Sequence, residues 1–215
     1  MQIVNLDPKL QPTGPLFFGK DLGIQRYDIF KYRELETLTK KQLSYFWNPE
    51  EIDVSPDKSS WEDMTDAYKH IYLSNLKYQV LLDTIQGRGP LATLGSVASL
   101  TELESCLSVW QFMEGIHSRS YTHLIKTIFP NPSEIFDQIL TDEAIVCRAK
   151  SITGQYNSFL DLGNRSKTDL YLLLISINIL EGIRFYVSFA CSFAFGTNGL
   201  MLKSAKIMQK IAQDE

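Results

Sequence analysis

The feature that most constrains this chain is the placement of acidic residues inside apolar helical stripes. Across residues 101–130, one face carries large apolar side chains at alternating spacings of four and three, the period of a core-facing helix. Glu114, His117 and Tyr121 occupy positions on that face, with apolar residues above and below them. A buried carboxylate is costly unless a partner neutralises it. The fold must therefore supply compensation at this point.

Three other segments repeat this interruption. In each of them, residues spaced three or four apart form a mostly apolar stripe that ends at an acid. The stripe before Asp83 consists of Leu73, Leu76 and Val80. The stripe before Glu181 consists of Leu170, Leu174 and Ile177, and the one before Glu215 of Met201, Ser204, Met208 and Ile211. Carboxylates and imidazole suit divalent cations such as iron or manganese, and two such cations would offset the negative charges. Helical bundles that hold a metal pair use this layout, in which separate helices each bring a carboxylate inward. The pattern favours a dinuclear metal site.

Each of these residues also has a plainer explanation. Glu114 and His117 could share their spacing by chance, Glu181 could be neutralised by Arg184, Asp83 could be solvated near a helix end, and Glu215 could be frayed. The joint pattern, with one carboxylate on each of four helices, is much harder to obtain by accident.

Turn and capping signals divide the chain into helices. Residues 1–25 are rich in proline and glycine and predict an irregular leader, and the remaining residues, 26–215, are interpreted as one helical domain. Helices are predicted over residues 27–47, 59–86, 101–129, 132–156, 167–195 and from 200 onward. Ser59-x-x-Glu62 and Thr101-x-x-Glu104 have the spacing of capping boxes. Strand-like alternation is nearly absent, so we predict an all-α bundle.

Composition excludes several classes of protein. A chain of 215 residues with 44% hydrophobic side chains can bury a sizeable core, and a net charge of −4 argues against a nucleic-acid-binding surface. The three cysteines, odd in number and set in apolar runs, are interpreted as reduced core residues of a cytoplasmic protein. The apolar stretch Leu170 to Phe195 contains Glu181 and Arg184, so it is interpreted as a buried helix and not as a membrane span.

Three long stretches carry a family resemblance. Residues 81–88 (LLDTIQGR), 114–123 (EGIHSRSYTH) and 181–189 (EGIRFYVSF) resemble the small (beta) subunit of class I ribonucleotide reductase. The resemblance covers nearly the whole chain, starting near Pro15. It implies a ferritin-like di-iron helical bundle, in which Asp83, Glu114 and His117 bind the first iron and Glu181 and Glu215 bind the second.

The resemblance also implies roles in radical chemistry. Tyr121 matches the tyrosine that is oxidised to a stable radical, and Trp47 and Asp214 match residues that, with His117, relay an electron and a proton toward the large (alpha) subunit. The large subunit then starts the reduction of ribonucleotides to deoxyribonucleotides. From their spacing along the helices, Phe185, Phe189 and Ile211 are placed to line a pocket that keeps water away from the radical, or else they are ordinary core residues.

One departure from the family pattern changes the expectation. The family's second Glu-x-x-His should begin at Glu215, but the sequence stops there, so the sixth ligand is missing. We expect a bundle that is incomplete at the C-terminus and a separate C-terminal polypeptide that completes it, in a small subunit that forms a homodimer. The alternatives are a catalytically silent helical fragment that acts as an interaction partner or relic, and an incomplete gene model.

Overall fold

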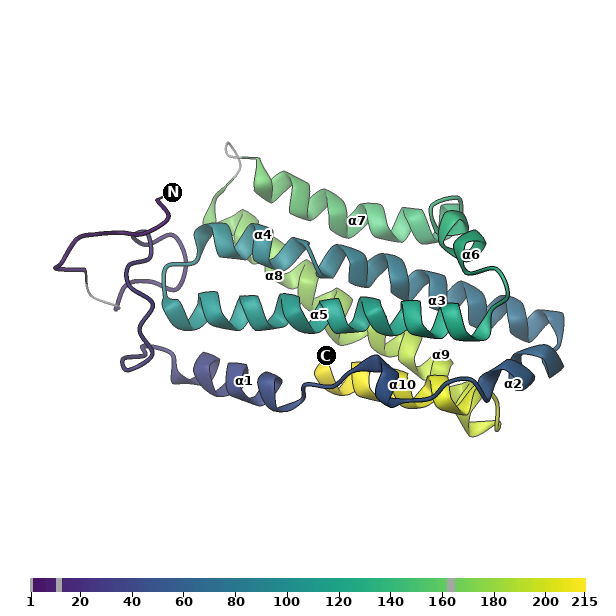
Figure 1. The fold of residues 1–215 in the computed structure, drawn as a ribbon. Coiled ribbons are helices and arrows are strands. Elements are labelled where there is room, and N and C mark those ends of the chain that lie inside the picture. Colours follow the sequence, from purple (N-terminus) through teal and green to yellow (C-terminus); the bar gives the residue numbers. More distant parts are fainter. Residues whose placement is uncertain (1, 11–12, 162–164) are drawn as a thin grey trace. The chain divides into compact units, whose positions relative to one another are not determined.

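The computed structural model describes residues 2–10, 13–161 and 165–215, and their regular structure is helical (Figure 1). The one β-type pairing among these residues is an isolated bridge between Phe17 and Ala98. The prediction of an all-α protein is confirmed. The chain divides into two compact units: Met1–Phe46 with Gln86–Glu114, and Trp47–Ile85 with Gly115–Glu215.

The first unit holds the leader and three helical segments. These are α1 (Arg33–Ser44), α4 (Gly89–Leu94), which continues into a short 3-10 turn (Gly95–Val97), and the first half of α5 (Thr101–Ile128). The helix predicted from residue 27 begins only at Arg33. The cause is Glu102, whose buried carboxylate accepts hydrogen bonds from the backbone N–H groups of Lys31 and Tyr32, at 3.0 and 3.1 Å.

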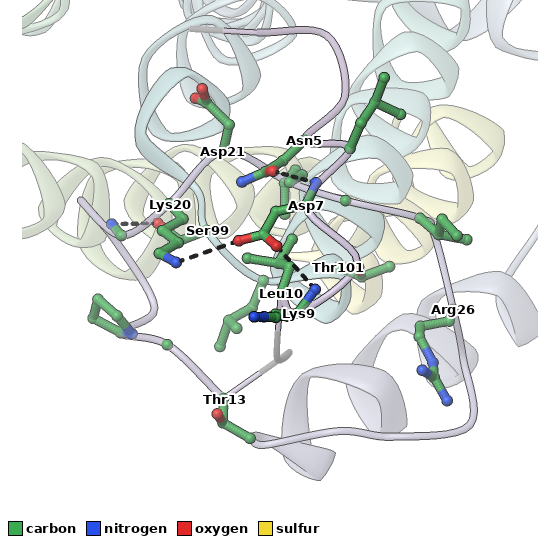
Figure 2. A pocket seen from close by; sticks show the side chains of 18 of the residues that line it. Asn5, Asp7, Lys9, Leu10, Thr13, Lys20, Asp21, Arg26, Ser99 and Thr101 are labelled. Carbon is green, nitrogen blue, oxygen red and sulfur yellow. Dashed lines mark hydrogen bonds and ion pairs between the residues drawn. The ribbon is translucent and has the colours of Figure 1, made fainter.

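A cavity of about 870 Å³ lies between the leader and the start of α5, and Figure 2 shows the side chains that line it. Local hydrogen bonds shape its wall, including one from the Lys9 backbone N–H to Asp7 at 2.9 Å. The Lys20 ammonium lies 3.9 Å from the same carboxylate. This exposed ion pair contributes little to stability, because solvent screens it.

The second unit contains most of the bundle. Its elements are a 3-10 turn (Pro49–Glu51), α2 (Asp57–Asp63), α3 (Asp66–Gln86), the second half of α5, α6 (Pro132–Ile139), α7 (Glu143–Leu160), α8 (Lys167–Ile179), a π-helical turn (Leu180–Arg184), α9 (Phe185–Thr197) and α10 (Leu202–Asp214). In this unit α7 packs on α8, and α10 packs on α9 and touches α2.

Two predicted helices are each divided in the structure. The helix predicted over residues 59–86 is α2 followed by α3, and its start at the Ser59 capping box is wrong because α2 already begins at Asp57. The helix predicted from Pro132 to Tyr156 is α6 followed by α7. Asp142 opens the second of these, since its carboxylate accepts hydrogen bonds from the N–H groups of Ala144 and Ile145, at 3.0 and 3.2 Å.

The apolar helix Lys167–Thr197 is less buried than predicted. It is long and apolar enough to cross a membrane by length and composition, but only 28% of its most hydropathic window is buried. One side packs inward through residues such as Leu173 and Phe185. The other side, here called the α8–α9 face, exposes seven large side chains: Tyr171, Leu172, Ile175, Ile179, Ile183, Tyr186 and Val187.

The cysteines differ in their surroundings. All three are free thiols, as predicted, but only Cys106 is buried, Cys191 is half-buried and Cys147 is exposed. The prediction of three core cysteines is therefore wrong for Cys147, which lies on the outer side of α7. Burial raises the pKa of the Cys106 and Cys191 thiols, which keeps both groups protonated and unreactive at neutral pH.

Asp142→Ala removes the side-chain cap of α7 and should lower the free energy of unfolding by about 1 kcal/mol. The measurement is chemical denaturation followed by circular dichroism. Lys150→Ala, an exposed change in the same helix, is the matched control and should leave stability nearly unchanged. Equal effects of the two changes would show that the cap does not stabilise α7.

Candidate metal centre

The first ligand position lies on the buried side of α3. The side chains that are buried on this helix at spacings of four and three are Tyr72, Leu76, Gln79, Asp83 and Gln86. The prediction chose the correct acid on this helix, but two of the apolar residues that it placed on the buried side, Leu73 and Val80, are only half-buried. Asp83 is fully buried, so this carboxylate is not the solvated helix-end residue of the plainer explanation.

The polar residues of the stripe predicted on α5 are buried. Glu114 is 1% exposed, His117 2% and Tyr121 0%. Glu114 is the last residue of the first unit, but it belongs to the same unbroken helix as His117 and lies one turn before it. Its Oε1 accepts a hydrogen bond of 2.9 Å from the Trp110 indole N–H, which fixes one carboxylate oxygen in place.

The predicted ligands form two overlapping groups. Asp83, Glu114 and His117 each offer a ligand atom within 4.8 Å of the others, and so do Glu114, Glu181 and Glu215. Glu114 belongs to both groups, which is the arrangement expected of a carboxylate that bridges two cations. The structure thus brings together all five residues that the sequence singled out.

A π-helical turn carries Glu181. Residues Leu180–Arg184 form one wide turn between α8 and α9, with Glu181 in its first part. Such turns are rare and occur frequently at functional sites, because the extra residue changes the direction of side chains that follow an otherwise regular helix. Glu181 is half-buried, with Leu180 and Phe185 fully buried on either side.

Asp214 links the indole of Trp47 to the imidazole of His117. Its Oδ2 accepts a hydrogen bond from Trp47 Nε1–H at 2.9 Å and lies 3.2 Å from His117 Nε2. All three side chains are buried. Because a carboxylate oxygen accepts hydrogen bonds, this contact places the proton of a neutral imidazole on Nε2.

This tautomer leaves a lone pair on His117 Nδ1. That nitrogen lies 3.2 Å from Glu215 Oε1, and the Glu215 side chain is only 4% exposed. Two atoms that both carry lone pairs are stable at this distance only with a proton or a cation beside them. A divalent metal meets this need for the whole cluster, because it is bound by neutral imidazole and by carboxylates. The residues present therefore fit a metal centre.

Tyr121 lies one turn beyond His117 and is surrounded by protein. The three aromatic and aliphatic residues that the sequence placed near it are all buried: Phe185 and Ile211 are fully enclosed, and Phe189 is 1% exposed. The Phe185 and Phe189 rings stack with centroids 6.0 Å apart. Phe185 and Ile211 sit on the same helical segments as Glu181 and Glu215, one turn away from each acid.

Two other histidines lie outside these groups, as expected. His123 Nε2 lies 3.1 Å from the carbonyl oxygen of Ile52, and His70 is exposed. Several buried polar residues were not predicted from the sequence, among them Gln79 and Asp57. Gln79 is buried on α3 beside Val80, the residue that was predicted to face inward, and Asp57 contacts residues 146 and 147 positions away, which no local pattern indicates.

The family model "Ribonucleotide reductase, small chain" matches residues 26–215. The chain belongs to this family. The beta subunit of ribonucleoside-diphosphate reductase from Haemophilus influenzae is 47% identical over 94% of this chain, and the corresponding subunit from Enterobacteria phage T4 is 41% identical over 99%. A solved ribonucleotide reductase R2 subunit from Clostridium botulinum superposes with a TM-score of 0.90, at 25% identity over 100% of this chain.

The match covers only part of each relative. The chain spans 59% of the Haemophilus influenzae subunit, 63% of the phage T4 subunit and 67% of the Clostridium botulinum chain. The predicted ferritin-like bundle is shown by these structural neighbours. The family membership predicted from residues 81–88, 114–123 and 181–189 is confirmed.

Asp214→Ala should lower the free energy of unfolding by about 1–3 kcal/mol, because the buried Trp47 indole N–H and the His117 ring lose their acceptor. Chemical denaturation of the metal-free chain measures this loss. Gln213→Ala, an exposed neighbour on the same helix, serves as the control. If both variants unfold at the same denaturant concentration, Asp214 does not hold the indole and the imidazole together.

Proposed function

We propose that this chain is the metal- and radical-bearing part of the small subunit of a ribonucleoside-diphosphate reductase. In this reaction the small subunit supplies the oxidising equivalent that starts the reduction of ribonucleotides to deoxyribonucleotides for DNA synthesis. The observation that carries the proposal is the cluster of four buried or half-buried carboxylates and one imidazole, one turn from an enclosed tyrosine. The names of the curated relatives support the same reaction.

Five residues would hold the metals. Asp83, Glu114 and His117 would bind one ion, and Glu181 and Glu215 would bind the second, with Glu114 between them. Iron is the proposed metal, and manganese suits the same oxygen and nitrogen donors. When bound, the metal pair supplies the one-electron oxidising power that the side chains themselves lack.

Tyr121 is the proposed site of oxidation. A neutral phenol has a pKa near 10, so it must lose a proton together with the electron. The resulting radical survives only where water and reductants are excluded. Full burial of Tyr121, Phe185 and Ile211 supports this role, since together they leave no solvent-exposed surface at these positions.

Trp47, Asp214 and His117 form the proposed path for the electron and the proton. The hydrogen bond of 2.9 Å from Trp47 to Asp214 and the 3.2 Å approach of Asp214 to His117 connect the indole to a proposed metal ligand. Asp214 is placed to hold the Nε2 proton while the indole exchanges an electron. In this proposal the large (alpha) subunit receives the oxidising equivalent.

We further infer that residues outside this sequence complete the second metal position, and that a separate C-terminal polypeptide supplies them. Support comes from the α8–α9 face, whose seven exposed apolar side chains lie on the same helical segment as Glu181. Exposed apolar surface of this kind marks a site where other protein binds. We propose that the completed small subunit acts in the cytoplasm as a homodimer.

The test of the radical site is electron paramagnetic resonance. The chain is mixed with the C-terminal part of a relative's small subunit and loaded with ferrous iron in the presence of oxygen. A tyrosyl signal is expected, and Tyr121→Phe should abolish it while the iron content stays unchanged. Tyr68→Phe, a change at an exposed tyrosine on α3 outside the α8–α9 face, is the matched control and should retain the signal.

A signal that persists in Tyr121→Phe would reject this residue as the radical site. Iron binding without any signal in the unchanged protein would reject the radical chemistry but not the metal centre. Absence of iron binding would reject the proposed function as a whole.

The α8–α9 face gives a second prediction. Ile183→Glu places a charge where the C-terminal polypeptide is proposed to pack, so it should weaken association about tenfold or more, by loss of apolar burial. Isothermal titration calorimetry measures the dissociation constant. Lys150→Glu, an exposed charge change on α7, should leave it unchanged. Equal affinities for both variants would show that the partner does not cover this face.

A further inference from the structure

The start of α10 has no cap from its own sequence. Met201, at the N-cap position, has a positive φ of 50° and makes no side-chain hydrogen bond to the helix. A helix leaves its first backbone N–H groups without partners inside the helix, and buried ones must find acceptors elsewhere. Ser204, in the first turn, is 1% exposed, so water does not serve this end.

Asp57 supplies the acceptors from α2. One carboxylate oxygen accepts from the Lys203 N–H at 3.1 Å, and the other accepts from the N–H and the hydroxyl of Ser204, both at 2.6 Å. Asp57 itself is 3% exposed. The neighbouring Ser60 hydroxyl accepts from the Met201 N–H at 3.0 Å. A negative charge here also interacts favourably with the helix dipole.

The same segment of chain reaches the far end of α10. Trp47, ten residues before Asp57, donates its indole N–H to Asp214 in the last turn. Figure 1 shows the stretch before α2 running alongside α10, which is shown in yellow. Residues 47–60 therefore contact both ends of a helix of 13 residues, about 20 Å long at 1.5 Å per residue.

We propose that Asp57 is a positioning residue for the metal centre: by capping α10 at its start, it sets where Asp214 and Glu215 stand at its end. Each of these acids lies 3.2 Å from a ring nitrogen of His117, Asp214 from Nε2 and Glu215 from Nδ1. A helix moves along its axis as a unit, so a shift at the capped end is carried to these carboxylates. Loss of the cap lets α10 slide or fray, and Asp214 then leaves the Trp47 indole.

A purely stabilising cap makes a different prediction. It would lower the stability of the whole unit without changing the hydrogen bond of Trp47 in the folded protein. Positioning, in contrast, changes that hydrogen bond while the protein stays folded. The test below measures both the Trp47 hydrogen bond and metal binding. Only the metal-binding measurement rests on the proposed function, because the Trp47 measurement needs no metal.

The experiment uses the full chain with ¹⁵N-labelled tryptophan and follows the indole N–H resonances by NMR. In Asp57→Ala, the Trp47 resonance should shift and its hydrogen exchange should accelerate about tenfold or more, while Trp110 stays unchanged. Mn²⁺ affinity, measured by calorimetry, should fall by about 10–100-fold, as when a residue that orients metal ligands is lost. Ser59→Ala, an exposed change on α2, should alter neither readout.

Two milder changes keep the test valid if Asp57→Ala does not fold. Asp57→Asn retains one acceptor oxygen and Ser204→Ala removes one of the three hydrogen bonds, so both should shift Trp47 less. An unchanged Trp47 resonance in these folded variants would overturn the proposal, whatever happens to Mn²⁺ affinity. A Trp47 shift in a protein whose unchanged form binds no Mn²⁺ would support positioning by Asp57 and reject the proposed function.

Discussion

The strongest constraint on this structure is the free-energy cost of placing several carboxylates close together in a protein interior. Asp83, Glu114, Glu181 and Glu215 approach one another and a single imidazole, where like charges repel and desolvation penalises each of them. A folded chain accepts this cost only where cations or protons balance the acids. Helices can build such a cluster because each one holds an acid at a fixed position along its inward face, while the backbone N–H and C=O groups form hydrogen bonds within the helix.

The surrounding contacts turn this cluster into a shaped site. Trp110 holds one oxygen of Glu114, and Asp214 holds the Nε2 proton of His117, so the remaining lone pairs face the cluster. Such outer contacts orient ligands and set their basicity. The π-helical turn at Glu181 and the cap that Asp57 places on α10 bring in the two acids that come from the C-terminal half of the chain. The family membership and the geometry therefore point to the same chemistry.

Local sequence patterns predicted most of the helices and the acids that face inward from them, because the spacing of apolar residues along a helix indicates which face is buried. The α5 and α10 stripes were accurate, but the α3 stripe was out of phase, since Tyr72 and Gln79 are buried where Leu73 and Val80 were expected. The break between α2 and α3 contains neither proline nor glycine. Its local signal is Thr65, whose hydroxyl accepts a hydrogen bond from the Tyr68 N–H at 3.4 Å at the start of α3, and the prediction did not use it. The role of Asp57 depends on a contact across 146 residues, which a single sequence does not reveal.

The most direct test of the central claim is a crystal of the chain grown with Mn²⁺ and measured at a wavelength where manganese scatters anomalously. The account predicts a strong anomalous peak among Asp83, Glu114 and His117, and a weaker one among Glu114, Glu181 and Glu215, where the ligands proposed to come from the C-terminal polypeptide are missing. A map without peaks, in which these acids are instead paired with one another through shared protons, would contradict it.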